Sequence, residues 1–300
     1  MSFQILSKIT VHEDEPLACH TTFHIGGNAR FFAYPHNEEE LRGLLDFAIK
    51  EDIPFFVIGN GSNILFSDTG FPGLIISMRR FSEKKYVVTE HSLVCSAGAL
   101  LQNVIEYAKE HARGGLEFLT YIPGTVGGAI MRNTSFRGEG TMKAMSDIIQ
   151  RISVIHTSGG DITYMNRDAL SFTYRSCKSV TGIIIEAELN VYPRDRKEIE
   201  DEINKNYNYR MRWHDMSYPS GGCIFKNPLY CEYTAGQLID FCGLKGYIVG
   251  GAKISDKHAN FIVNYNSASA RDVLQLIDIA RSTVRKQFSI DLDLEMEYVA

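Results

Sequence analysis

The sequence predicts an α+β protein of two or three domains, and three observations lead to this prediction. Residues 31–58 read as a β-α-β unit, because a capped amphipathic helix separates two apolar strands. Residues 80–193 are rich in strand patterns and hold only one or two helix patterns. A proline and charged residues at 193–196 then mark a boundary before a long charged helix. A chain of 300 residues also exceeds what one hydrophobic core usually serves.

Composition excludes several classes of protein. The net charge of −5 argues against nucleic acid as the main partner, because neutralising phosphates needs a concentrated basic surface. The six cysteines form no C-x-x-C pair and have no histidine at zinc-finger spacing. We therefore expect reduced thiols in a cytoplasmic protein, with no metal site. No signal peptide and no apolar run of transmembrane length is seen, so no membrane partner is expected.

The helix of the β-α-β unit is predicted in most detail. Asn37 is a good N-cap, and Glu40 stands where a capping box places its acid. Apolar residues at 41, 44, 45, 48 and 49 follow the helical spacing, so one face should be buried. Pro54 precedes the apolar strand 55–58, whereas residues 1–20 read as an irregular lead-in.

The remaining elements follow in order. Before the boundary we predict strands at 74–76, 86–89, 93–96, 152–155 and 162–164, a helix opened by Gly98, a turn at 158–160, and the longest strand at 182–191. After the boundary we predict helices at 198–212 and 235–242, the second stopped by Gly243, a strand at 259–264, a long helix capped by Ser269, and a half-buried strand at 290–298.

Two glycine-rich stretches are candidate ligand sites, Gly59–Leu65 and Tyr121–Ile130. Glycine lets the backbone turn through positive φ and approach another surface closely. The first stretch follows a strand, at the end where α/β proteins place ligands. The second could aim several backbone N–H groups at an anion, but it matches neither a P-loop nor G-x-G-x-x-G. From these residues alone, a tight turn and a phosphate cradle are both open.

Eight motifs in a fixed order resemble the bacterial UDP-N-acetylenolpyruvoylglucosamine reductase family, from Thr21 to Tyr298. They are TTFHIGG, GNGSNIL, IPGTVGGAI with LEF before it, GCIFKNP, GLKG, GGA, SDKHA and a C-terminal Glu. Each motif is weak by itself, but eight in register over nearly the whole chain are specific. The length, and the short path between the middle region and Cys223, resemble the type II subclass, which lacks an inserted substrate-covering loop.

The resemblance implies a two-part FAD-binding domain of the vanillyl-alcohol-oxidase/PCMH type and a separate α+β substrate-binding domain. We place the FAD-binding subdomains at 1–79 and 80–193 and the substrate-binding domain at 194–288, with 289–300 near the first. The implied activity is that of a UDP-N-acetylmuramate dehydrogenase. Such an enzyme reduces UDP-N-acetylglucosamine enolpyruvate to UDP-N-acetylmuramate, in peptidoglycan precursor synthesis, with non-covalent FAD and with NADPH as reductant. We expect a monomer whose partner is this small UDP-amino sugar.

The resemblance also implies which residues wrap FAD: Gly59, Asn60, Gly61, Ser62, Asn63, Ile122, Pro123, Gly124, Thr125, Gly127, Gly128 and Ala129. The segment directly after these residues departs from the family's usual sequence. Relatives usually read Asn-Ala-Gly-Ala-Tyr/Phe-Gly, whereas residues 133–138 of this chain read Asn-Thr-Ser-Phe-Arg-Gly. Larger residues there mean either that the loop is rebuilt or that flavin binding is altered.

Three residues match the family's catalytic positions. Arg175 can fork onto a substrate carboxylate, and Glu295 matches the C-terminal Glu, with Asp293 and Glu297 as alternative registers. Cys223 stands where most relatives have the Ser that protonates the intermediate. A thiol, with an ordinary pKa of ~8.5, is a better acid than a hydroxyl. We therefore expect Cys223 to donate the proton after hydride transfer from flavin N5.

Four further residues match substrate-contacting positions: Tyr174, Arg210, Lys226 and Asn227. Five residues after Arg210 the chain has Asp215, where a proline is common in relatives. Two other functions are open. One is another FAD oxidoreductase of this fold, such as an oxidase, against which GCIFKNP and the terminal Glu argue. The other is a non-catalytic flavin- or nucleotide-binding relative, which the altered 133–138 loop keeps open.

Overall fold

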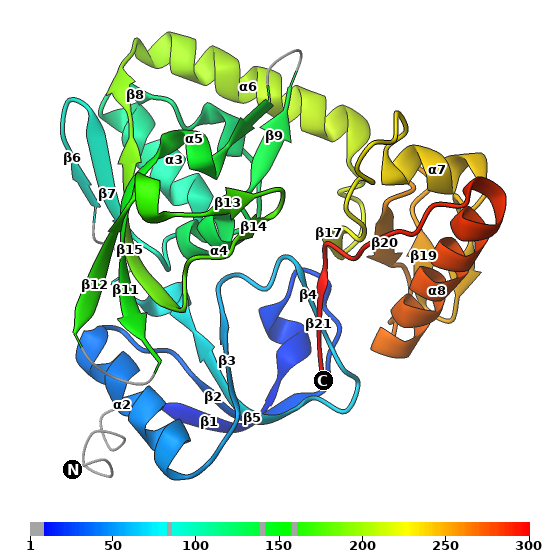
Figure 1. Ribbon diagram of the computed structural model, residues 1–300, viewed down its shortest axis with the longest axis horizontal. Coiled ribbons are helices and arrows are strands. Elements are labelled where there is room, and N and C mark those ends of the chain that lie inside the picture. Colours follow the sequence, from blue (N-terminus) through cyan, green and yellow to red (C-terminus); the bar gives the residue numbers. More distant parts are fainter. Residues whose placement is uncertain (1–8, 83–85, 139–141, 158–160) are drawn as a thin grey trace. The chain divides into compact units, whose positions relative to one another are not determined.

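The computed structural model describes residues 9–82, 86–138, 142–157 and 161–300 (Figure 1). The chain divides into two compact units. Unit 1 holds residues 1–12, 31–60 and 73–210, and unit 2 holds residues 13–30, 61–72 and 211–300. The three domains predicted from the sequence, with boundaries after residues 79 and 193, stay predictions.

The β-α-β unit forms around a four-stranded sheet. Its order is β1 (Val11–Pro16), β2 (Asn28–Ala33), β5 (Phe71–Ser77) and β3 (Phe55–Ile58). Helix α2 (Glu38–Lys50) follows β2, and its apolar face packs in one core with residues of β5, including Leu74 and Ile76. The Asn37 side chain accepts the Glu40 N–H at 3.0 Å, which confirms the predicted cap.

The prediction of an irregular lead-in over residues 1–20 is wrong for its described part. Residues 11–16 form the outer strand β1, and Leu17–His20 form the 3-10 helix η1. Glu13, Asp14 and Glu15 have low strand propensity. Pairing with β2 is a tertiary contact that outweighs this propensity, and the exposed side chains of Glu13 and Asp14 suit an edge strand.

A five-stranded antiparallel sheet forms most of the middle of the chain. Its order is β12 (Ile162–Asn166), β11 (Ile149–His156), β15 (Gly182–Asn190), β7 (Ser92–Ser96) and β6 (Tyr86–Val88). The predicted strands at 86–89, 93–96, 152–155 and 162–164 are confirmed and pair antiparallel, two by two, although the turn at 158–160 lies outside the described residues. Helix α3 (Leu101–Glu110) buries Leu101, Val104, Ile105 and Ala108 in the same core, as its spacing predicts.

Shorter elements complete unit 1: η2 (Met78–Arg80), β8 (Arg113–Gly114), η3 (Glu117–Leu119), α4 (Val126–Met131), β9 (Ser135–Arg137), β10 (Met142–Ala144), α5 (Met145–Ile148), η4 (Arg167–Ala169), β13 (Phe172–Thr173), β14 (Ser176–Cys177) and β16 (Tyr192–Pro193). Helix α6 (Arg196–Trp213) starts two residues before the predicted bound. Its buried residues are Ile199, Asn206 and Arg210, so the inner face is partly polar, which hydrophobic spacing could not reveal.

Unit 2 has its own sheet and core. The sheet order is β17 (Ser220–Cys223), β20 (Phe261–Asn264), β19 (Ala252–Ile254) and β18 (Ile248–Val249). Helices α7 (Ala235–Phe241) and α8 (Ala270–Phe288) pack on its core. Gly243 follows α7 with φ of 69°, and the Ser269 hydroxyl accepts the Asp272 N–H at 3.1 Å. These contacts confirm the predicted stop and cap.

The C-terminal alternation is only partly a strand. Residues Glu297–Val299 form β21, which pairs in parallel with β4 (Ile64–Phe66). Upstream of β21, one isolated bridge joins Leu294 to Phe225. Among the described residues, no helix combines the length and apolarity needed to cross a membrane.

Candidate active site

The first glycine-rich loop lies against the second within unit 1. A Cβ on Gly59 would lie 2.3 Å from the Thr125 hydroxyl oxygen, so only glycine permits this approach. The Asn60 amide nitrogen donates to the Pro123 carbonyl at 2.8 Å. Two stretches that are far apart in the sequence, both predicted to wrap FAD, are thus brought together.

The second stretch does not offer the free amides that its glycines suggest. The N–H groups of Val126 and Gly127 donate to carbonyl oxygens of residues 99 and 97, at 2.9 and 2.8 Å. The Gly128 N–H donates to the Thr125 hydroxyl at 3.3 Å. These bonds hold the start of α4 in place. By contrast, no described residue accepts a hydrogen bond from the backbone N–H of Gly59 or Asn60. The residues present therefore fit a phosphate-bearing cofactor, with amides supplied from the first loop.

The rest of that first loop belongs to unit 2. A Cβ on Gly61 would lie 2.2 Å from the His20 carbonyl oxygen, and φ there is 60°, so glycine is required. The Asn63 side chain donates to the Glu295 carbonyl at 3.0 Å, which ties the loop to the C-terminal segment. Sequence reasoning assigned Asn63 to FAD, but its side-chain amide also has this structural partner.

Arg175 occupies the tight turn between β13 and β14 with φ of 58°. A positive φ is sparsely populated by residues other than glycine and is common at functional sites. The guanidinium donates to the Ser135 hydroxyl at 3.2 Å and lies 5.7 Å from the Tyr174 ring centre. The turn and the Ser135 contact therefore fix the orientation of the Arg175 guanidinium, and the Tyr174 ring lies next to it.

Part of the unusual 133–138 segment forms the strand β9. Residues 135–137 pair with 142–144, and Asn133 donates to the Thr173 carbonyl at 3.1 Å. The Phe136 ring lies 4.2 Å below the guanidinium of Arg210, which is buried and also donates to the Phe118 carbonyl. The larger residues of this segment thus contact both arginines that the sequence singled out.

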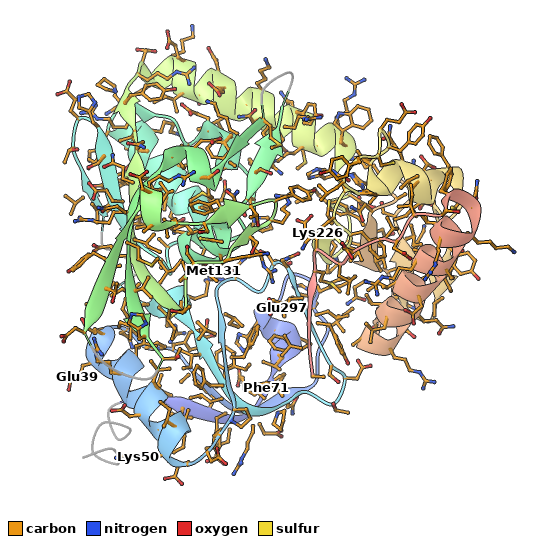
Figure 2. The ribbon with its side chains drawn as sticks, in the orientation of Figure 1. Glu39, Lys50, Phe71, Met131, Lys226 and Glu297 are labelled. Atoms are coloured by element: carbon orange, nitrogen blue, oxygen red, sulfur yellow. The ribbon has the colours of Figure 1, made fainter. Side chains whose placement is uncertain are left out.

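The segment that follows Cys223 pairs with the segment that holds Glu295 in unit 2. The Glu295 N–H donates to the carbonyl of Ile224 at 2.8 Å, and the Lys226 N–H donates to the Asp293 carbonyl at 2.8 Å. The two segments therefore run side by side, with Cys223 at the end of β17 (Figure 2 labels Lys226). Asp293 is exposed, whereas Glu295 and Glu297 are both half-buried, so exposure argues only against Asp293 as the carboxylate of this site.

Asn260 was missed by sequence reasoning, although it directly follows the SDKHA motif. Its side chain accepts the Phe225 N–H at 2.9 Å and donates to the Phe225 carbonyl at 2.8 Å. Its backbone carbonyl accepts the Ile224 N–H. Asn260 thus clamps the backbone directly after Cys223. Asn227 is itself structural in part, because its side-chain oxygen accepts the Ala235 N–H at the start of α7.

Asp215 tethers the loop that carries Asn260. The Ser255 hydroxyl donates to its carboxylate at 2.6 Å and in turn accepts the Lys257 and His258 N–H groups. Burial acts to raise the pKa of the Asp215 carboxyl, but hydrogen bonds from Ser255 and Ser217 lower it below its ordinary value. Asp215 is therefore held ionised as an acceptor.

We predict that His258 makes stability pH-dependent between about pH 7 and pH 5. Burial, and to a smaller extent the charge of Lys245, lowers the pKa of His258 despite a backbone hydrogen bond that acts to raise it, and its Nδ1 accepts the Asn260 N–H at 3.2 Å. The unfolded chain therefore binds the proton more readily, and stability falls as pH drops through the ordinary histidine range. His258→Gln should flatten this part of a melting-temperature profile. An equally steep profile in the variant would contradict the assignment, and His91→Gln, on an exposed turn, is the control.

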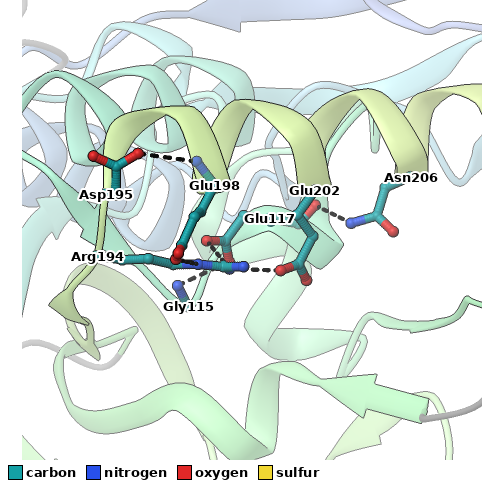
Figure 3. Close-up of polar contacts among 7 residues, drawn as sticks. All are labelled: Gly115, Glu117, Arg194, Asp195, Glu198, Glu202 and Asn206. Carbon is teal, nitrogen blue, oxygen red and sulfur yellow. Dashed lines mark hydrogen bonds and ion pairs between the residues drawn. The ribbon is translucent and has the colours of Figure 1, made fainter.

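Figure 3 shows a second polar cluster that the sequence did not reveal, just before the Tyr121–Ile130 stretch. The Glu117 side chain, 2% exposed, pairs with Arg194 at 2.9 Å and accepts the Gly115 N–H at 2.8 Å. Asn206 of α6 donates to the Glu117 carbonyl at 2.9 Å. The cluster joins α6 to η3 and so supports the segment that leads into the glycine-rich stretch.

A metal site and a surface pocket were the remaining candidates for function, and neither is assigned one. Within the described ranges, no group of three His, Cys, Asp or Glu side chains could hold a metal ion. A surface pocket of about 450 Å³ lies in unit 2, lined in part by His24, Asp68 and Asn264. None of the predicted site residues lines this pocket. The Asp68 carboxylate already accepts the first two N–H groups of α8.

The fold and the loop geometry define a flavin-dependent oxidoreductase built on an FAD-binding domain. A family model described as an FAD binding domain matches residues 29–165, and one described as the UDP-N-acetylenolpyruvoylglucosamine reductase C-terminal domain matches residues 214–299. The predicted fold class is confirmed by these matches.

Individual proteins with this family name are also similar to the chain over nearly its whole length. The UDP-N-acetylenolpyruvoylglucosamine reductase of Moorella thermoacetica is 37% identical, over 97% of this chain and 93% of the relative. That of Bacillus subtilis is 36% identical over 95% and 93%. The crystal structure of the Thermus caldophilus reductase (MurB) matches with a TM-score of 0.80 and 32% identity, over 97% of this chain and 99% of the other. The chain therefore belongs to the UDP-N-acetylenolpyruvoylglucosamine reductase family, as its motifs indicate.

Proposed function

We propose that this chain reduces UDP-N-acetylglucosamine enolpyruvate to UDP-N-acetylmuramate for peptidoglycan synthesis. When bound, FAD supplies the redox chemistry by accepting electrons from NADPH and passing a hydride to the vinyl carbon of the substrate. The observation that supports the proposal is the backbone pairing of residues 224–226, directly after Cys223, with residues 293–295 of the C-terminal segment. Neither alternative function gives a role to this pairing of the GCIFKNP segment with the C-terminal Glu segment.

Each proposed residue has a distinct task. As the hydride is added, negative charge builds on the substrate carboxylate and α-carbon, and the Arg175 guanidinium meets that charge through paired hydrogen bonds. The Cys223 thiol then delivers its proton to the α-carbon. Glu295, which is half-buried, assists charge stabilisation or proton positioning. Tyr174, Arg210, Lys226 and Asn227 are proposed to hold the substrate, Arg210 from its buried place over the Phe136 ring.

The FAD contacts stay part of the same proposal. Gly59 and Asn60 supply amides and close approach in unit 1, with Ile122–Ala129 shaping the adjoining wall. Gly61, Ser62 and Asn63 continue the loop.

A flavin turnover assay tests the function. The purified protein should be yellow, its flavin absorption should bleach with NADPH, and the band should return when the enolpyruvyl sugar nucleotide is added without oxygen. Rapid recovery in air alone would favour an oxidase. A colourless protein that takes up no FAD would favour a non-catalytic relative.

The cellular setting is proposed more broadly. A net charge of −5 and the reduced cysteines are consistent with a cytoplasmic protein that binds no nucleic acid. The proposed state is a monomer, which light scattering of the purified holoprotein would test.

A further inference from the structure

Arg79 lies at the FAD loop of unit 1, although no motif drew attention to it. Strands β3 and β5 are parallel, and Ile58 pairs with Ser77. The residues that follow each strand therefore start at one edge of the sheet, where parallel sheets bind ligands. Asn60 stands two positions beyond β3, and Arg79 stands two positions beyond β5.

A chain of hydrogen bonds connects Arg79 to both predicted FAD stretches. Its guanidinium Nη1 donates to the Asn60 side-chain oxygen, and the Asn60 nitrogen donates to the Pro123 carbonyl at 2.8 Å. Both ends of the Asn60 amide are thereby used. Asn60 consequently offers a ligand its backbone N–H, while the guanidinium lies one hydrogen bond away.

The positive charge of Arg79 is not neutralised by the protein. Arg79 is exposed, and among the described residues no carboxylate forms an ion pair with it. A guanidinium has five N–H donors, and the structure uses one. Its neighbour Arg80 differs, because its guanidinium lies 4.4 Å from the ring centre of Tyr34.

We propose that Arg79 binds the diphosphate of FAD, together with the backbone N–H groups of Gly59 and Asn60. The diphosphate carries two negative charges, and a guanidinium matches phosphate oxygens through paired, charge-assisted hydrogen bonds. The amides of α4 are bonded within the chain and do not compensate this charge. Arg79 supplies the missing cation. The FAD requirement itself follows from family membership, so the present proposal concerns the residue that holds the diphosphate.

The test measures the release of FAD from the diluted holoprotein at 50 and 500 mM KCl. Released FAD is detected by the recovery of flavin fluorescence. Arg79→Met should raise the FAD dissociation constant about 10- to 100-fold at low salt. The difference from wild type should shrink at high salt, since exposed charge pairs are screened. Arg80→Met removes the same charge from the adjacent position and should stay within about twofold of wild type.

A second variant separates charge from positioning. Arg79→Gln is neutral but can still donate to the Asn60 oxygen, so it should lose FAD affinity as Arg79→Met does. If Arg79→Gln bound FAD with wild-type affinity, the proposal would be overturned. The role of Arg79 would then be to position the Asn60 side chain. Unchanged FAD release in both variants would also overturn it. If FAD release is unchanged and KM rises for NADPH but not for NADH, the guanidinium binds the 2′-phosphate of the nicotinamide cofactor instead, and the proposal is overturned.

Discussion

Cys223→Ala is expected to lower kcat by about 100- to 10,000-fold, the range that a positioned proton donor contributes. Alanine has no proton to deliver to the α-carbon, and no other thiol lies in the GCIFKNP segment. Cys223→Ser should stay within about tenfold of wild type, because a hydroxyl of similar size can donate from the same position. The backbone clamp by Asn260 does not depend on the Cys223 side chain, so both variants should fold.

Half-reactions distinguish proton donation from a structural role. Reduction of the flavin by NADPH should proceed at the wild-type rate in Cys223→Ala, since the proton is needed only after hydride leaves the flavin. Reoxidation by substrate should be slow. Cys242→Ala, a half-buried thiol at the end of α7, is the matched control and should leave both rates unchanged. An alanine variant at position 223 with near-normal kcat would refute the assignment.

Glu117→Ala is expected to lower the free energy of unfolding by about 3 kcal/mol, as loss of one partner from a buried ion pair does. The substitution removes the 2.9 Å pair with Arg194 and leaves the Gly115 N–H without its acceptor (Figure 3). Burial acts to lower the pKa of Arg194, but Glu202 and Glu117 raise it above its ordinary value. The Glu202 contact at 2.5 Å stays in the variant, which limits the loss.

Thermal melting of the holoprotein measures the effect, with an expected fall of about 6–12 °C. Glu198→Ala is the matched control, because Glu198 contacts the same arginine but its side chain is 66% exposed. Exposed pairs contribute at most about 1 kcal/mol, so its melting temperature should change little. Equal melting temperatures for the two variants would show that the buried cluster does not stabilise η3.

Local features were predictable from the sequence because neighbouring residues determine them. The Asn37 and Ser269 caps and the Gly243 stop depend on bonds within one turn of helix. The buried face of α3 follows from the helical period alone. The glycine motifs indicated the family because each needs a particular backbone geometry, as the contact of Gly59 with Thr125 shows.

Other contacts could be seen only in the tertiary structure, because they join residues that are far apart in the sequence. Val126 and Gly127 looked like free amide donors, but they donate to the carbonyls of residues 99 and 97, which follow β7. Ser135 read as part of a disturbed flavin loop, yet its hydroxyl holds the Arg175 guanidinium.

The sequence by itself thus determined the fold class, the family and the candidate residues Arg175, Cys223 and Glu295. Only the tertiary structure paired Ile224, the residue after Cys223, with Glu295 and placed Arg79 beside Asn60. The physical reason is that hydrophobic period, caps and turns act over a few residues. Hydrogen bonds between distant segments depend instead on how whole strands and loops pack.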